Sequence, residues 1–393
     1  MIHLSVTNVK GPVGVMLHSI LGRAGFRVGI YTSPHLITFR ERIKIGREMI
    51  SEDEVLALSQ RVWPATDPNS PPTFFEFVTA LALLYFAEKK IDLAIIETGL
   101  GGRLDSTNVI EPLAAAITNI ALEHTEHLGG TLAEIASEKA GIIKAGVPLV
   151  CGNLVREAVE VIQARAKELA CPTLVLGKDF LVETLRSDDQ GLPSIDYRLE
   201  GLELNNLAVP LAGPHQADNA AVALTLAWVL NGLGFSVTEE HFRSGLAEAQ
   251  WPGRAERFAA GSWPPEGSVA KAPLILDGAH NPAGAQALAA MLETLKRRRL
   301  HVILGVMADK DIGEVLGRIL NLADRIFLTH LIFLRASLPE LLFVIIVSSL
   351  GWHPQLTTLH RSLPEAFRSS ADEAVSTLLC LLSASPFTQC VNM

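Results

Sequence analysis

Cysteine is scarce in this chain, and the cysteines that occur lie far apart. Cys151, Cys171, Cys380 and Cys390 show neither C-x-x-C spacing nor the Cys/His spacing of a zinc site. The pattern therefore indicates neither a zinc site nor a disulfide scaffold, and it fits a protein of the reducing cytoplasm.

Positive charge and long apolar runs are also in short supply. The net charge of -9 argues against a protein that binds the phosphate backbone of nucleic acid. The most apolar run, Leu341–Leu350, is far shorter than the roughly 20 residues that a membrane-spanning helix needs. No basic stretch precedes the apolar run at Ile2–Val6, so the start does not read as a signal peptide. We expect neither nucleic acid nor a membrane as a partner.

Short β-branched runs alternate with amphipathic stretches in the first half. A length of 393 residues with 49% hydrophobic residues is ample for two or three globular domains. The strand-like runs are Ile2–Val6, Val28–Tyr31, Leu93–Ile96 and Ala115–Ile120, and helical patterns lie at Val15–Ala24 and Val78–Lys89. This order predicts βαβ units and a mostly parallel sheet covered on both faces.

A second alternation begins after the Gly/Ser/Pro-rich stretch Ala260–Pro273. Strand-like runs follow at Leu274–Leu276 and His301–Leu304. We predict an α/β protein with a parallel-sheet domain over 1–259, a linker over 260–273 and a smaller Rossmann-like domain over 274–393. The segment Cys171–Leu211 reads as an irregular or β-rich excursion within the first domain.

Polar residues follow each of the first four predicted strands. They are Thr7–Pro12, Thr32–His35, Glu97–Arg103 and Glu123–His124. Taken singly, such residues are more often caps or turn residues than ligands. Because ligands of parallel sheets bind beyond the carboxyl ends of the strands, their joint placement predicts a site there, with partly solvated side chains.

The first of these turns resembles a phosphate-binding loop only in part. Lys10 and Gly11 are present, but Val6, Val9 and Pro12 stand where glycines and a magnesium-binding hydroxyl would be wanted. Proline is acceptable in the first turn of a following helix. Alone, the turn reads as structural.

Longer segments carry a family resemblance. They read TFFEFVTALALLYFAEKKIDLAIIETGLGGRLDSTNVI, ITNIALEHTEHLGGTLAEIASEKAGIIK, GPHQADNAAVAL, WPGRAERF, LDGAHNP and YTSPHLITFRERI. Together they resemble the folylpolyglutamate synthase and dihydrofolate synthase family, within the Mur-ligase-like ATP-dependent amide ligases. The resemblance runs from about Ile2 to Thr329.

The resemblance implies a reaction and its cofactors. Family members phosphorylate a carboxylate with ATP, and the amine of L-glutamate displaces the acyl phosphate. The acceptor would be dihydropteroate or a folate, and the cofactors ATP and Mg²⁺, with a monovalent cation as a further possibility. A cleft between two closing domains would protect the intermediate from water.

The resemblance also implies roles for individual residues. Ser33, Glu97 and His124 match metal ligands, although histidine is an unusual ligand for magnesium. The residues that match nucleotide contacts are Thr7, Asn8, Lys10, Gly11, Pro12, Asn219, Arg254, Asp277 and His280. The residues that match acceptor-binding segments are Thr73, Phe74, Phe75, Glu76, Leu104, Asp105 and Ser106. Periodicity alone would place both phenylalanines in the core, whereas the motif favours ring stacking by one of them.

Lys139 lies in a predicted short helix. Thr131 and Glu134 have capping-box spacing, and Gly141 marks a C-terminal stop, so Ile135 and Lys139 share one face. A solvated lysine is the ordinary interpretation. In related enzymes the matching lysine is carbamylated, and the catalytic set implied here is Lys139, His124 and Glu97.

Three departures from the family keep alternatives open. The first strand begins almost at Met1, where the family has several tens of residues before it. The phosphate loop is degraded, and Thr377–Met393 lacks the expected closing strand. One alternative is a catalytically impaired homologue that keeps a folate or nucleotide cleft. A Mur-type cell-wall ligase is less favoured, because the TFFE, GLGGRLDSTN and TSPHL segments are of the folate type. We expect a cytoplasmic monomer.

Overall fold

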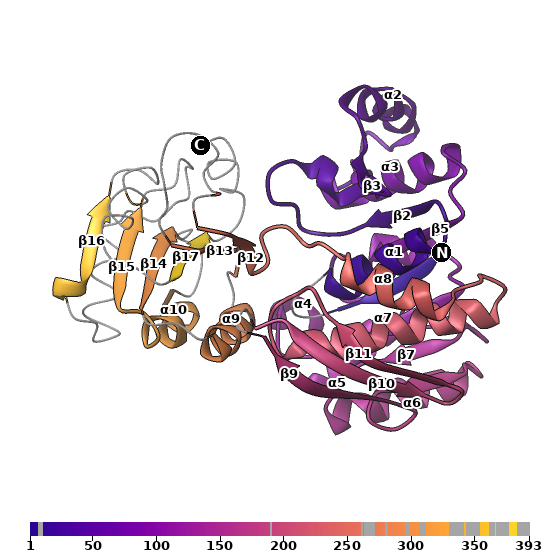
Figure 1. Ribbon diagram of the computed structural model, residues 1–393. Helices are drawn as coiled ribbons and strands as arrows, with labels where there is room; N and C mark the ends of the chain where they lie inside the picture. Colours follow the sequence, from indigo (N-terminus) through magenta and orange to yellow (C-terminus); the bar gives the residue numbers. More distant parts are fainter. Residues whose placement is uncertain are drawn as a thin grey trace. The chain divides into compact units, whose positions relative to one another are not determined.

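The computed structural model describes residues 1–6, 11–188, 191–260, 262, 272–279, 282–295, 299–305, 312–329, 342, 354–360, 366 and 377–382. The chain forms two compact units (Figure 1). The first comprises Met1–Arg186, Pro193–Pro210 and His215–Gln250, and the second Ser187–Leu192, Leu211–Pro214 and Trp251–Met393. The expected α/β architecture with two domains is confirmed.

An eight-stranded sheet in the order β4-β3-β2-β5-β1-β6-β7-β8 forms the first unit. Its strands are β1 (Ile2–Ser5), β2 (Val28–Tyr31), β3 (Ile43–Ile45), β4 (Glu48–Met49), β5 (Leu93–Glu97), β6 (Ala114–Ile117), β7 (Leu149–Cys151) and β8 (Thr173–Val175). From β2 to β8 all neighbours are parallel, and β3 and β4 add an antiparallel edge. The four predicted strands of the first half are present.

Helices cover both faces of this sheet. They are α1 (Pro12–Arg23), α2 (Glu52–Val62), α3 (Phe74–Glu88), α4 (Thr125–Leu128), α5 (Leu132–Ala140), α6 (Arg156–Glu168), α7 (His215–Gly232) and α8 (Glu239–Ala247). Ile95 of β5 faces Gly14 of α1, whereas its neighbour Ile96 packs in the cluster with α3. Because successive strand residues point to opposite faces, α1 and α3 lie on opposite sides of the sheet.

A small antiparallel sheet follows β8 in the chain. Its strands are β9 (Phe180–Ser187), β10 (Pro193–Leu199) and β11 (Leu202–Ala208), in the order β11-β10-β9. It confirms the prediction of a β-rich excursion. The aromatic ring of Tyr197 packs on Phe180, and the Tyr197 hydroxyl lies 2.9 Å from Thr225 Oγ1 on α7.

A six-stranded sheet in the order β12-β13-β17-β14-β15-β16 forms the second unit. The elements are β12 (Glu256–Phe258), β13 (Leu274–Asp277), α9 (Pro282–Thr294), β14 (Leu300–Gly305), α10 (Ile312–Leu320), β15 (Arg325–Thr329), β16 (Thr357–His360) and β17 (Thr377–Leu382). β12 pairs antiparallel with β13, so residues just before the predicted linker belong to this sheet. The boundary at 260–273 stays a prediction, because most of that stretch is not among the described residues.

The expectation that Thr377–Met393 lacks a closing strand is wrong. β17 lies between β13 and β14 and pairs parallel with both. Leu379 and Cys380 are buried, so this apolar run fills the centre of the sheet. Such a run has no polar alternation to mark it as a strand, because both of its faces are covered.

Among the residues that the structure describes, no helix is both long enough and apolar enough to cross a membrane.

Candidate active site

Ser33 and Glu97 meet at the carboxyl edge of the first sheet. Glu97 ends β5, and Ser33 lies two residues beyond β2, the parallel neighbour of β5. The Ser33 backbone N–H donates to Glu97 Oε2 at 3.4 Å. The structure thus brings together two of the three predicted metal ligands. It differs from the sequence argument in solvation, since Glu97 is only 1% exposed.

Lys139 reaches the same edge from α5. The predicted capping box is present, with the Thr131 side chain accepting from Glu134 N, and α5 buries Ile135 and Lys139 on one face. Lys139 Nζ donates to the carbonyl of Val6 at 3.0 Å, directly after β1. The ordinary interpretation of a solvated lysine therefore does not hold, because docking of this helix face takes the side chain out of water.

Gly141 follows the end of α5, as predicted, but for a different reason. Its φ of -60° is right-handed, so no left-handed cap requires glycine there. A Cβ at this position would lie 2.3 Å from Arg103 Cα. Glycine is needed because the segment after β5 approaches the helix end closely.

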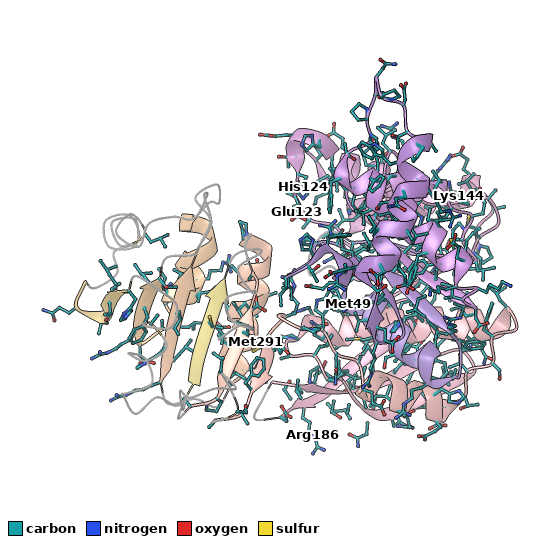
Figure 2. The ribbon with its side chains drawn as sticks, turned by 90° about the horizontal axis from the view of Figure 1, so that it is seen from above. Met49, Glu123, His124, Lys144, Arg186 and Met291 are labelled. Carbon is teal, nitrogen blue, oxygen red and sulfur yellow. The ribbon has the colours of Figure 1, made fainter. Side chains whose placement is uncertain are left out.

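His124 lies beside Glu123 on the segment that leads into α4. Its backbone is left-handed, with φ 52°. Its Nε2 is 3.9 Å from Glu123 Oε1, and its side chain is 46% exposed. Figure 2 shows the two residues together. Within the described ranges no group of three or more His, Cys, Asp or Glu side chains is gathered as a metal site. This does not test the predicted set, which includes a serine.

The turn before α1 is described only at its end. Gly11 has a φ of 102°, a conformation that favours glycine, and Pro12 occupies the first turn of α1. Thr7, Asn8 and Lys10 lie outside the described residues. Their predicted phosphate contacts stay predictions.

The two predicted acceptor-site phenylalanines have different surroundings. Thr73 and Glu76 form a capping box that begins α3. Phe75 packs against Tyr31, with 5.8 Å between ring centroids, whereas Phe74 is 55% exposed. Of the two rings, Phe74 is therefore the one that is open for stacking on a ligand.

Two residues that the sequence argument did not single out flank the Phe74 ring. The ring meets Phe39 edge-on, with 5.9 Å between ring centroids. The Arg42 guanidinium carbon lies over the face of Phe74, 5.4 Å from the ring centroid. Arg42 also donates to His35 Nδ1 at 3.0 Å. The YTSPHLITFRERI segment contains these residues, but their spacing gives no sign that they meet a helix beginning at Phe74.

Residues 99–106, which we call the acceptor loop, follow β5. Leu104 is 79% exposed, whereas Asp105 is buried. The Ser106 hydroxyl donates to Thr79 Oγ1 on α3 at 3.1 Å. The loop thus presents Leu104 outward and is tied to α3 through Ser106. A role for these residues in acceptor binding stays a prediction.

The remaining predicted nucleotide contacts belong to different units. Asn219 lies on α7 of the first unit and donates to Gln216 at 3.0 Å.

Asp277 ends β13 of the second unit, and its carboxylate accepts from Ala255 N at 2.6 Å and Ala279 N at 2.7 Å. Burial raises the pKa of Asp277, although Arg254 and these N–H groups act in the opposite direction. Asp277 therefore fixes the backbone beside Arg254. His280 is outside the described residues.

Known protein families and individual proteins are similar to this chain over most of its length. Residues 49–227 match the Mur ligase middle domain, and residues 266–385 match the Mur ligase glutamate ligase domain. A Bacillus subtilis dihydrofolate synthase/folylpolyglutamate synthase is 39% identical over 87% of this chain and 79% of its own length. A Thermotoga maritima folylpolyglutamate synthase structure has a TM-score of 0.83 at 35% identity, covering 96% of this chain and 85% of that one. The structure of Escherichia coli FolC with DHPP and ADP has a TM-score of 0.82 at 30% identity, covering 97% and 85%.

Proposed function

The chain belongs to the folylpolyglutamate synthase/dihydrofolate synthase family of Mur ligases, and we propose on this premise that it ligates L-glutamate to dihydropteroate or a folate with ATP. The acceptor carboxylate would be phosphorylated, and the glutamate amine would displace phosphate from the acyl phosphate. The observation that carries this proposal is the convergence of Ser33, Glu97 and Lys139 at one sheet edge.

The oxygen ligands at this edge suit Mg²⁺. Glu97 is buried, and the Ser33 backbone lies against its carboxylate, so a hydroxyl and a carboxylate are available at neighbouring strand ends. Hard divalent cations prefer oxygen ligands of this kind. Glu97 and Ser33 would hold Mg²⁺, which would supply positive charge to offset that of the nucleotide phosphates. His124 would complete the set.

The acceptor would lie against the exposed Phe74 ring and the acceptor loop. Phe74 offers an aromatic ring that is largely exposed, and Leu104 offers an exposed apolar side chain. Arg42, over the Phe74 ring, places a guanidinium beside this surface. Within the first unit, Asn219 on α7 would contact the adenine nucleotide.

The degraded phosphate loop favours a second candidate, a homologue that binds its ligands but turns over slowly. Pro12 has no N–H to offer at the start of α1, where phosphate loops use N–H groups and a hydroxyl. This candidate predicts acceptor binding without ligation.

Phosphate release from ATP separates the two candidates. The purified chain with ATP and Mg²⁺ is supplied with dihydropteroate or folate, with and without L-glutamate. The proposed function predicts release that requires both acceptor and glutamate. Binding of the acceptor without such release would identify the impaired homologue.

A further inference from the structure

A chain of hydrogen bonds runs from the centre of the first sheet to the acceptor loop. His3 of β1 is fully buried, and its Nε2 lies 2.9 Å from Thr107 Oγ1, 104 residues away in the sequence. The Thr107 hydroxyl donates to Asp105 Oδ1 at 2.5 Å. A threonine hydroxyl has one proton, so His3 Nε2 must be the donor to Thr107. Burial lowers the pKa of His3 to about 3, which keeps the ring neutral.

The Asp105 carboxylate accepts four hydrogen bonds. Thr107 supplies its backbone N–H at 3.0 Å as well as its hydroxyl, both to Oδ1. Gly99 N at 2.9 Å and Leu100 N at 2.8 Å donate to Oδ2. A carboxylate has about four lone-pair positions, so these contacts use the acceptor capacity of Asp105. Its oxygens hold the start of the acceptor loop.

Asp105 holds the backbone of Gly99 and Leu100, and this backbone lies where the acceptor loop packs against α3. A Cβ on Gly99 would lie 2.5 Å from the Phe75 ring, so the loop backbone packs directly on the start of α3. Ser106 joins the other end of the loop to Thr79 on the same helix. A shift of Gly99 and Leu100 would therefore move the loop relative to the Phe74 ring.

We propose that His3 and Thr107 are positioning residues, which set the shape of the acceptor loop for a pterin or folate through Asp105. This inference rests on the proposed function, and it assigns a role to two buried residues that would touch no substrate. Binding sites whose contacts are held by a second layer of hydrogen bonds lose affinity when that layer is removed.

Thr107→Val is the test variant, because valine keeps the shape and removes the hydroxyl. Thr107→Ser keeps the hydroxyl and serves as the conservative rescue. Thr225→Val is the matched control, since Thr225 is also fully buried, lies 2.9 Å from the Tyr197 hydroxyl and donates to Ala221 O at 2.8 Å. Dissociation constants for dihydropteroate and for ADP are measured by calorimetric titration, and melting temperatures by scanning calorimetry.

We expect Thr107→Val to weaken dihydropteroate binding about tenfold, because it removes a hydrogen bond to a charged group. The dissociation constant of Thr107→Ser for dihydropteroate should stay within about threefold of the wild-type value. Thr225→Val should lower the melting temperature about as much as Thr107→Val does and leave dihydropteroate binding unchanged. ADP binding should be equal in all variants.

Equal dihydropteroate affinity in Thr107→Val and Thr225→Val would overturn the inference. Should Thr107→Val not fold, His3→Leu removes the donor to Thr107 while leaving the four donors of Asp105. Unchanged acceptor binding in His3→Leu would then overturn it. A wild type that binds no pterin or folate would overturn the proposed function, and this inference with it.

Discussion

Buried ionisable residues distinguish this chain at the scale of single side chains. Glu97, Lys139 and Asp277 are each less than a tenth exposed, although charged residues are seldom buried without partners. Two of them end strands at a sheet edge, and the third is brought to such an edge by α5. Sequence could identify the residue types and the strand ends. It could not show their burial, which depends on segments distant in sequence closing over them.

Glu97→Gln should abolish glutamate-dependent phosphate release while the chain stays folded. Glutamine keeps the volume but loses the charge that would hold the cation, so the rate should fall at least about a hundredfold. Because the replaced carboxylate is buried, removal of its charge should not lower the melting temperature by more than a few degrees.

The matched control for this change is Glu54→Gln on α2. The Glu54 carboxylate accepts from Ser51 N at 2.9 Å and pairs with Lys89, so its role is structural. Activity should survive in this control. A Glu97→Gln variant that melts lower yet keeps the wild-type rate would contradict the metal assignment.

One buried histidine, His3, and two partly buried ones, His18 and His215, should make the first unit sensitive to acid. Burial lowers the pKa of His3 to about 3, and those of His18 and His215 to about 4, from an ordinary 6.5. Below pH 6.5 the unfolded chain therefore binds more protons than the folded chain does. The stability that these groups contribute is complete above that pH and is lost as the pH falls toward about 4.

Denaturant unfolding measures this effect. Between about pH 7.5 and about pH 5.5, each histidine should remove roughly 1 kcal/mol from the free energy of unfolding. His18→Gln should reduce the loss by about one third, its share among three similar groups. An unfolding midpoint that is the same at both pH values would contradict this account.

Among the contacts between elements, backbone hydrogen bonding joins the acceptor loop to α5. Arg103 N donates to the carbonyl of Glu138 at 2.8 Å, and Asn108 Nδ2 donates to the carbonyl of Gly141 at 3.1 Å. Lys144 Nζ donates to the carbonyl of Asn108 at 3.0 Å. The loop that would bind the acceptor and the helix that carries Lys139 are thus joined to each other.

Gly141→Ala should therefore destabilise the chain despite a right-handed backbone that suits alanine. The added Cβ would lie 2.3 Å from Arg103 Cα, and overpacking of this kind costs about 1–3 kcal/mol. Gly22→Ala on α1 is the control, since a Cβ there meets nothing within 4 Å. The control should gain up to about 1 kcal/mol from helix propensity. Equal unfolding free energies for both variants would refute the close-approach explanation.

Sequence patterns predict the elements of this protein unevenly. β1, β2, β5 and β6 were predictable because each is a short β-branched or small-residue run beside an amphipathic helix. The start of α5 was predictable because its capping box is local. β17 was not, since its pairing with β13 and β14 joins residues far apart in the chain. The His3–Thr107 contact was hidden for the same reason.

For the whole molecule, the comparisons and the sheet edge support one chemistry. The two family matches cover residues 49–227 and 266–385, and the edge of the first sheet supplies a buried carboxylate and a buried lysine. Composition argued against nucleic acid as a partner, the short apolar runs argued against a membrane, and periodicity predicted the α/β class. Only the motif resemblance pointed to glutamate ligation, because fold class alone does not determine function.

Mass spectrometry of the product shows whether this chain adds glutamate to a pterin acceptor. The wild-type chain is incubated with dihydropteroate, L-glutamate, ATP and Mg²⁺, and the pterin fraction is analysed, with Glu97→Gln treated in parallel. We expect an acceptor heavier by one glutamyl residue, which forms only when ATP and glutamate are both present and does not form with Glu97→Gln. An acceptor that the folded wild type binds but leaves unmodified would contradict the proposed function.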